Sequence, residues 1–232
     1  MFVDKISVDA HVGGYLADLP VVRSLVASPL ELTRPITAIS GENGSGKSTL
    51  VEAIAVAAGA NPEGGSRNAR FSSVEDPVSD LWRALALRRP RNPRDVFFLR
   101  GETYSGLAGY YETLVDEPFA NLNQLSHGQG LLRILRERLS PETLVLLDEP
   151  EDGLSVFAQL ELLGILWHLA GRGAQVIMST HSPVLLGIPG AQLFEMTGDG
   201  LSPVMYDESE AVRAWEDFTS DPRGTADYLV QQ

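Results

Sequence analysis

The stretch that decides the fold is Gly41-Glu-Asn-Gly-Ser-Gly-Lys47-Ser48-Thr49, which matches the phosphate-loop pattern G-x-x-x-x-G-K-[ST]. Residues 35–40 before it form a short β-branched run that predicts a strand. Residues 50–58 after it carry apolar side chains at helical spacing. A strand, a glycine-rich turn and a helix N-terminus together cradle an anion with main-chain N–H groups and the helix dipole. We therefore predict a phosphate site here, in preference to a plain glycine turn with a surface lysine.

The residues of this loop have distinct predicted roles. Lys47 would bridge the β- and γ-phosphates of a nucleotide, and Ser48 would ligate Mg²⁺. The rest of the loop would contact the phosphates mainly through its main chain, namely Gly41, Asn43, Gly44, Ser45, Gly46 and Thr49. The loop therefore predicts a nucleotide and a magnesium ion as ligands.

Two adjacent carboxylates follow a strongly apolar run. Residues 143–147 predict a central parallel strand, and Asp148 and Glu149 stand at its carboxyl end, the edge where open α/β sheets bind ligands. Asp148 would hold Mg²⁺ through water, and Glu149 would orient and deprotonate an attacking water. The alternative is a polar strand end followed by a loop that starts at Pro150.

Two further patterns are weaker when taken alone. Residues 125–129 precede a helix face of Leu131, Leu132 and Leu135, so Ser126 and Gly128 would have free N–H groups that offer a second anion site. An ordinary Ser N-cap explains the same residues. His181 follows the apolar run 174–178 and would lie at the same sheet edge as Asp148. A capping or packing role is the alternative for a single histidine.

The order of apolar segments indicates the architecture. Strands expected at 2–8, 35–40, 96–99, 143–147 and 174–178 are separated by helical patterns, which favours a sheet covered by helices on both sides. Residues 60–95 are rich in Pro, Gly, Ser and Arg and predict a mobile segment with one amphipathic piece. Residues 199–232 carry eight acids against two arginines, and we expect a peripheral hairpin plus helix there.

Composition excludes several classes of protein. The 232 residues, 44% hydrophobic and 21% charged, suit one large α/β domain. There is no cysteine, so disulfides, thiolate metal sites and cysteine nucleophiles are impossible, and the four histidines are widely spread. The charged start of the chain and the lack of an apolar run of about 18 residues predict a cytoplasmic protein without membrane insertion.

The charge is acidic overall but uneven. The net charge of −13 opposes non-specific attraction to nucleic acid. Residues 67–100 nevertheless hold eight arginines against four acids, a local net charge of +4. This segment is either a solvated face or a contact patch for nucleic acid or an acidic partner.

Four motifs in order give a far more specific pattern than any one. Asp148 follows Gln129 by 19 residues, and His181 follows Glu149 by 32. Across about residues 35–183 the chain resembles the ATP-binding cassette (ABC) ATPases, with their phosphate loop, LSxGQ signature, Asp-Glu strand end and switch histidine. The resemblance implies one α/β P-loop domain over residues 1–232, with a mostly parallel central sheet, helices on both faces, an N-terminal β element and a small helical lobe inserted at about 60–140.

The resemblance also implies how the site works. ATP and Mg²⁺ would bind, and two copies would associate when ATP is bound. Ser126, Gly128 and Gln129 of one copy would then cover the phosphates held by the other. Within one copy, Lys47, Glu149 and His181 would act on the same ATP. Such a water-excluded site strengthens every charge contact on the transferred group.

The chain departs from the family pattern in three places. The family's loop glutamine should lie near residues 97–102, where none occurs; Arg100 or Glu102 would replace it, Glu102 as a metal ligand. Ser155 stands where the family often has an aspartate. Tyr15 is the only upstream tyrosine for stacking on adenine, and a core or surface role explains it equally well.

Details of the motifs indicate a branch of the family. The Gly-x-Asn-Gly loop, Asp-Glu-Pro-Glu and Ser-His-Gly are similar to stand-alone ATPases related to the SMC and RecF group. Leu125 follows Ser48 by 77 residues, which leaves no room for a long coiled coil. The resemblance therefore favours a switch in nucleic acid maintenance or defence with an unknown protein partner. A transporter's nucleotide-binding subunit and a non-catalytic ATP-dependent module are the alternatives.

Overall fold

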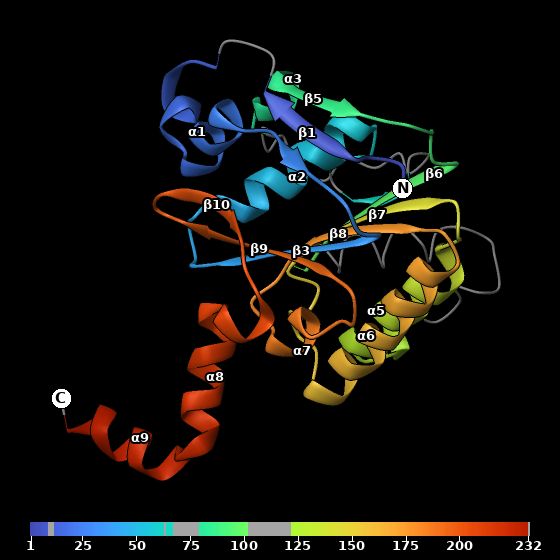
Figure 1. The fold of residues 1–232 in the computed structure, drawn as a ribbon. Coiled ribbons are helices and arrows are strands. Elements are labelled where there is room, and N and C mark those ends of the chain that lie inside the picture. Colours follow the sequence, from blue (N-terminus) through green and yellow to red (C-terminus); the bar gives the residue numbers. More distant parts are fainter. Residues whose placement is uncertain (9–11, 63, 67–78, 102–121, 232) are drawn as a thin grey trace.

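A seven-stranded sheet forms the centre of the computed structural model, which describes residues 1–8, 12–62, 64–66, 79–101 and 122–231. The strand order is β10-β9-β3-β8-β7-β6-β4 (Figure 1). Five neighbouring strands run parallel, and β10 and β4 join the two edges antiparallel. The strands are β3 (Ile36–Gly41), β4 (Gly65–Ser66), β6 (Asp95–Arg100), β7 (Thr143–Asp148), β8 (Gln175–Ser179), β9 (Gln192–Thr197) and β10 (Gly200–Pro203). The predicted mostly parallel sheet is confirmed.

A second, antiparallel sheet of three strands forms the predicted N-terminal β element. Its order is β2-β1-β5, from β1 (Lys5–Val8), β2 (Leu30–Glu31) and β5 (Leu85–Arg88). The amphipathic piece expected near 81–87 divides into the short helix α3 (Leu81–Ala84) and β5. The range 60–140, expected to form an inserted lobe, thus contributes β4, β5 and β6 to the two sheets. Residues 63, 67–78 and 102–121 of that range lie outside the described residues.

Helices cover both faces of the central sheet (Figure 1). On one face lie α1 (Pro20–Ala27) and α2 (Lys47–Ala58); on the other lie α5 (His127–Arg138), α6 (Val156–Gly171) and α7 (Pro183–Leu186). Short 3₁₀ turns occur at η1 (Gly14–Asp18), η3 (Leu122–Gln124) and η4 (Tyr206–Glu208). In the described ranges, no helix is both long and apolar enough to cross a membrane.

The alternation of side chains along β7 explains the two helical layers. Leu144 and Leu146 pack into the core beneath α2, whereas Val145 and Leu147 pack into the core beneath α5 and α6. All four are fully buried. A strand covered on both faces therefore reads as an unbroken apolar run, as residues 143–147 do.

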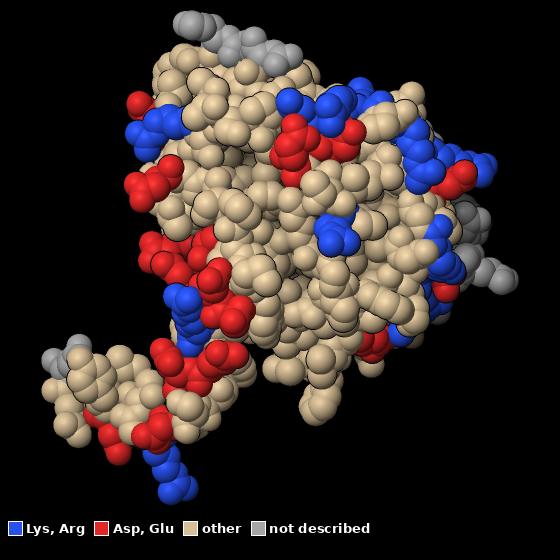
Figure 2. All heavy atoms as spheres, in the orientation of Figure 1, with Lys and Arg blue, Asp and Glu red and all other residues tan. Residues whose placement is uncertain are grey.

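The acidic end of the chain forms an arm. The hairpin of β9 and β10 is followed by α8 (Glu210–Ser220) and α9 (Pro222–Val230), which extend away from the body (Figure 1) and carry many acidic side chains (Figure 2). The sequence predicted one helix here. There are two because Pro222 cannot continue α8, and the Asp221 carboxylate accepts a hydrogen bond from the Gly224 N–H to begin α9.

Candidate nucleotide-binding site

The phosphate loop lies between β3 and α2, as the sequence predicts. β3 ends at Gly41 and α2 begins at Lys47. Gly41 has a φ of 133°, and a Cβ atom there would lie 2.2 Å from the main-chain oxygen of Met196 on β9. Gly46, the residue before α2, has a φ of 100°. These two positions accept only glycine, because a side chain would clash at the first and strain the second.

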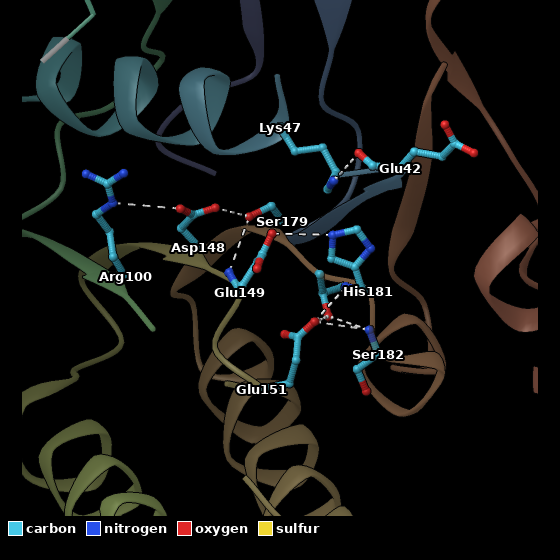
Figure 3. Close-up of polar contacts among 10 residues, drawn as sticks. Glu42, Lys47, Arg100, Asp148, Glu149, Glu151, Ser179, His181 and Ser182 are labelled. Atoms are coloured by element: carbon cyan, nitrogen blue, oxygen red, sulfur yellow. Dashed lines mark hydrogen bonds and ion pairs between the residues drawn. The ribbon is translucent and has the colours of Figure 1, made fainter. Parts of the chain in front are cut away.

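Lys47 is turned into the loop. Its side chain is almost wholly buried, and Nζ donates a hydrogen bond of 2.8 Å to the main-chain oxygen of Glu42 (Figure 3). Burial lowers the pKa of Lys47, and the nearby Glu149, Asp148 and Glu151 carboxylates partly oppose that shift. A bound anion would therefore stabilise the charged lysine.

The loop also holds an unsatisfied hydroxyl. Ser45 Oγ is buried and has no hydrogen-bond partner among the described residues. With Glu42, Asn43 and Gly44 it lines a cavity of about 450 Å³. A buried hydroxyl without a partner costs free energy, so a phosphate oxygen would relieve it. Together with Lys47, this hydroxyl shows that the residues present fit a nucleotide.

Asp148 ends β7 and is held by its neighbours. Ser179 Oγ on β8 donates a hydrogen bond to Asp148 Oδ1. Arg100, at the end of β6, places Nε 3.9 Å from Asp148 Oδ2 and Nη1 2.9 Å from Glu52 Oε2 on α2. Of the two expected substitutes for the family's glutamine, Arg100 thus lies beside Asp148. Glu102 lies outside the described residues.

The residues present fit a magnesium ion. Ser48 lies in the first turn of α2, which packs against β7, the strand that carries Asp148. Within the part of the chain that the structure describes, no three His, Asp or Glu side chains form a cation cage. Mg²⁺ usually takes one or two protein ligands and fills its other positions with phosphate oxygens and water, and Ser48 and Asp148 are side chains of that kind.

Glu149 and His181 are brought together at the same sheet edge. Glu149 has a φ of 48°, a left-handed backbone, and its N–H donates to the main-chain oxygen of Ser179 at 3.1 Å. Its Oε1 lies 3.3 Å from His181 Nε2 (Figure 3). Such a backbone costs about 1–3 kcal/mol and often marks a functional site.

The sequence reasoning missed Glu151 as a site residue. Its Oε1 accepts hydrogen bonds from Thr180 Oγ1 at 2.7 Å, His181 N at 2.6 Å and Ser182 N at 3.1 Å. Burial raises the pKa of Glu151, and these hydrogen bonds partly oppose the shift. The available signal was the second glutamate of Asp-Glu-Pro-Glu, three residues after the strand end at Asp148.

The signature residues form a complete helix cap. Ser126 is the N-cap of α5, its Oγ accepts from the Gln129 N–H, and its own N–H donates to Gln129 Oε1. The expectation of a free N–H group is therefore wrong for Ser126, because the capping box uses it. Gly128 is buried, and a Cβ there would lie 3.0 Å from Leu154 in the loop after β7.

Comparisons with known proteins agree with this geometry. Two family models match, "AAA domain, putative AbiEii toxin, Type IV TA system" over residues 113–187 and "AAA domain" over residues 22–87. The cytochrome c biogenesis ATP-binding export protein CcmA of Bartonella henselae is 32% identical over 165 residues, which cover 65% of this chain and 76% of that protein. The chain belongs to the ATP-binding cassette family of P-loop ATPases.

Longer relatives share only part of their length with this ABC chain. A "Putative ABC transporter ATP-binding protein" of Streptomyces coelicolor is 31% identical over 161 residues, and one of Streptomyces avermitilis is 32% identical over 175. The matches cover 62% and 68% of this chain. The chain spans 28% and 30% of the length of these relatives.

Solved structures share the fold. The SMC head domain from Thermotoga maritima has a TM-score of 0.50 at 17% identity, with 88% of this chain and 100% of that chain covered. A "putative metal-chelate type ABC transporter" in an inward-facing conformation has a TM-score of 0.52 at 15% identity, with 92% and 88% covered. The predicted fold class, an α/β P-loop domain of the ABC ATPase type, is confirmed.

Proposed function

We propose that this ABC-family protein hydrolyses MgATP, with the phosphates held at residues 41–49. The observation that carries the proposal is the placement of Glu149. Its carboxylate stands at the sheet edge beside Lys47 and Asp148, held by a left-handed backbone with His181 Nε2 3.3 Å away. A carboxylate at that edge, near but distinct from the metal-binding Asp148, suits a general base.

Each side chain then has a defined task. Lys47 exchanges the Glu42 oxygen for phosphate oxygens, and Mg²⁺, when bound, neutralises phosphate charge. Glu149 accepts a proton from water as the water oxygen bonds to the γ-phosphorus and the bond to the β–γ bridging oxygen breaks. His181 positions Glu149 and the attacking water at the γ-phosphate. The products are ADP and inorganic phosphate.

The proposal includes association of two copies when ATP is bound. Ser126 and Gln129 are exposed at the N-terminus of α5, so a second molecule can reach them. Gly128 fixes this turn against Leu154, in the loop that follows Glu149. In the assembled pair, the turn of one copy would cover the phosphates bound by the other.

Light scattering tests this step. Purified Glu149→Gln protein, which should bind ATP without consuming it, is measured with and without MgATP. We expect the mass to double with MgATP, and a Lys47→Ala control to stay monomeric. An unchanged mass despite measured ATP binding would remove the trans roles of Ser126, Gly128 and Gln129.

For the biological output we propose a stand-alone switch in nucleic acid maintenance or defence that acts through a protein partner. The description of the family model over residues 113–187 supports defence. Most described arginines of the basic segment are engaged within the chain: Arg88 pairs with Asp4, Arg94 with Glu142, and Arg91 lies over Phe2. We therefore expect ATP turnover to change little when DNA or RNA is added.

The second candidate output is energy supply to a transporter. The names of the curated relatives, transporter ATP-binding proteins and an export protein, favour it. Co-purification of this chain with a membrane protein from native cells would support that candidate over the stand-alone switch. ATP-dependent association with almost no turnover by the wild-type protein would instead favour a non-catalytic module.

A further inference from the structure

Glu151 ties the loop after β7 to the loop after β8. One carboxylate oxygen, Oε1, accepts hydrogen bonds from Thr180 Oγ1, His181 N and Ser182 N, at 2.7, 2.6 and 3.1 Å. The two main-chain donors belong to the histidine that faces Glu149 and to the residue after it (Figure 3). Glu151 therefore fixes the backbone from which the His181 side chain extends.

Further hydrogen bonds hold the segment 180–182, among them one from Ser182 N to Thr180 Oγ1 at 3.0 Å. Thr180 N donates to the main-chain oxygen of Ile39 on β3 at 3.0 Å. Ser182 Oγ caps α7 by accepting from Leu185 N, and it donates to Gln159 Oε1 on α6 at 2.7 Å. The His181 main-chain N–H lies between these anchors and is bound by Glu151. Removing Glu151 would thus free the main chain at the histidine itself.

The burial of Glu151 lowers the stability of the fold, which a purely structural hydrogen bond would not require. Its Oε2 is buried with no hydrogen-bond partner among the described residues. The Glu149 carboxylate nearby adds to the burial that raises the pKa of Glu151. A buried polar atom without a partner lowers stability, and such costs tend to persist where a site needs a fixed geometry.

We infer that Glu151 is a positioning residue, which sets the distance between His181 and Glu149 through the main chain of residues 180–182. The inference rests on the proposed ATP hydrolysis. It adds a residue that does not touch the phosphates and acts only through the histidine. Its role needs an acceptor at the place of Oε1 and does not need a negative charge.

The molecule provides a matched control at the amino end of β8, the strand that leads to His181. Gln175 begins β8, is fully buried, and its Oε1 accepts from the main-chain N–H groups of Phe2 and Val3 at 2.6 and 2.8 Å. Its Nε2 donates to the Val3 oxygen. Gln175 thus makes three hydrogen bonds to the main chain, and Glu151 makes two to the main chain and one to the Thr180 hydroxyl. Gln175 lies at the end of β8 away from His181.

The experiment measures kcat and KM for ATP in six proteins: wild type, Glu151→Gln, Glu151→Asp, Glu151→Ala, Gln175→Ala and Glu149→Gln. Misplacement of a catalytic group by about 1 Å can cost about 100-fold in rate. We expect Glu151→Ala and Glu151→Asp to lower kcat about 10- to 100-fold with KM within about twofold. Glu151→Gln keeps the acceptor and should retain most of kcat, and Gln175→Ala should retain all of it.

A double variant separates positioning from general destabilisation. His181→Ala with Glu151→Ala should turn over ATP no more slowly than His181→Ala alone, because both changes remove one function. If Glu151→Ala does not fold, the comparison of Glu151→Asp with Glu151→Gln decides, and His181→Ala is then combined with Glu151→Asp.

Three outcomes would overturn the inference. They are an unchanged kcat in Glu151→Asp, an equal loss in Gln175→Ala, or multiplied losses in the double variant. If wild type and Glu149→Gln turn over ATP at the same rate, the proposed ATP hydrolysis itself is wrong, and the role of Glu151 is wrong with it.

Discussion

The two ends of β8 are built in opposite ways. At the amino end, the amide of the buried Gln175 is hydrogen-bonded to the main chain of Phe2 and Val3 through both its oxygen and its nitrogen. Beside the carboxyl end, in the loop after β7, Glu151 Oε2 is buried with no partner in the described ranges, and Glu149 has a left-handed backbone. One end satisfies its buried polar groups, while the other carries costs of the kind that often mark a functional site.

The largest expected effect is a loss of kcat on substitution of Glu149, beside the carboxyl end of β8. Glu149→Gln removes the base and keeps the shape of the side chain, so we expect kcat to fall about 10²- to 10⁴-fold, the usual contribution of a general base. ATP affinity should stay within a few-fold because Lys47 and the loop are unchanged. Phosphate release and equilibrium ATP binding measure the two quantities. A variant with wild-type kcat would exclude Glu149 as the base.

The sequence predicted the features that depend on local spacing and left open or missed those that depend on long-range contacts. The strand-loop-helix around residues 41–49 and the apolar strands were predictable because local spacing encodes them. The choice between Arg100 and Glu102 as the substitute for the family's glutamine was left open. The contact of Arg100 with Asp148 depends on the pairing of β6 with β7, which is a long-range contact. Glu151 was missed as a site residue because its three donors belong to a different strand end, about 30 residues later.

Helix ends were a second feature that the sequence analysis predicted incorrectly. The N–H group of Ser126 was expected to be free, but it donates to the Gln129 side chain in a capping box. The single helix expected near the C-terminus is divided at Pro222. Both signals, Ser-x-x-Gln and Asp-Pro, were present in the sequence, and a local capping analysis would have found them.

The second prediction concerns the satisfied end. Gln175→Ala leaves the N–H groups of Phe2 and Val3 without their side-chain acceptor, so the free energy of unfolding should fall by about 1–3 kcal/mol. The kcat should not change. Urea unfolding followed by circular dichroism measures the first quantity and phosphate release the second. A large fall in kcat at unchanged stability would reverse the roles of the two ends.

A smaller gain in stability is expected at the strained residue. Glu149→Gly removes a side chain from a left-handed backbone with a φ of 48°, a conformation that costs about 1–2 kcal/mol for other residues. Glycine also enlarges the conformational entropy of the unfolded chain, so the net increase in the free energy of unfolding should be about 1 kcal/mol. Turnover should be lost. A glycine variant less stable than Glu149→Ala would contradict strain at this position.

The smallest expected effect is a pH dependence at Glu151. Because burial raises the pKa of its carboxyl from the ordinary value of 4.5, the folded protein holds this proton more tightly than the unfolded chain does. The resulting stabilisation is complete below pH 4.5 and is lost as the pH rises through the folded pKa. Glu151→Gln has no such proton, so its free energy of unfolding relative to wild type should increase from about pH 4 to about pH 7. Urea unfolding of both proteins across that range measures the difference, and Gln175→Ala serves as a control whose difference from wild type should stay constant. A constant difference for Glu151→Gln as well would mean that Glu151 is ionised at the same pH in the folded and unfolded chain, and the carboxyl end of β8 would then carry one cost fewer.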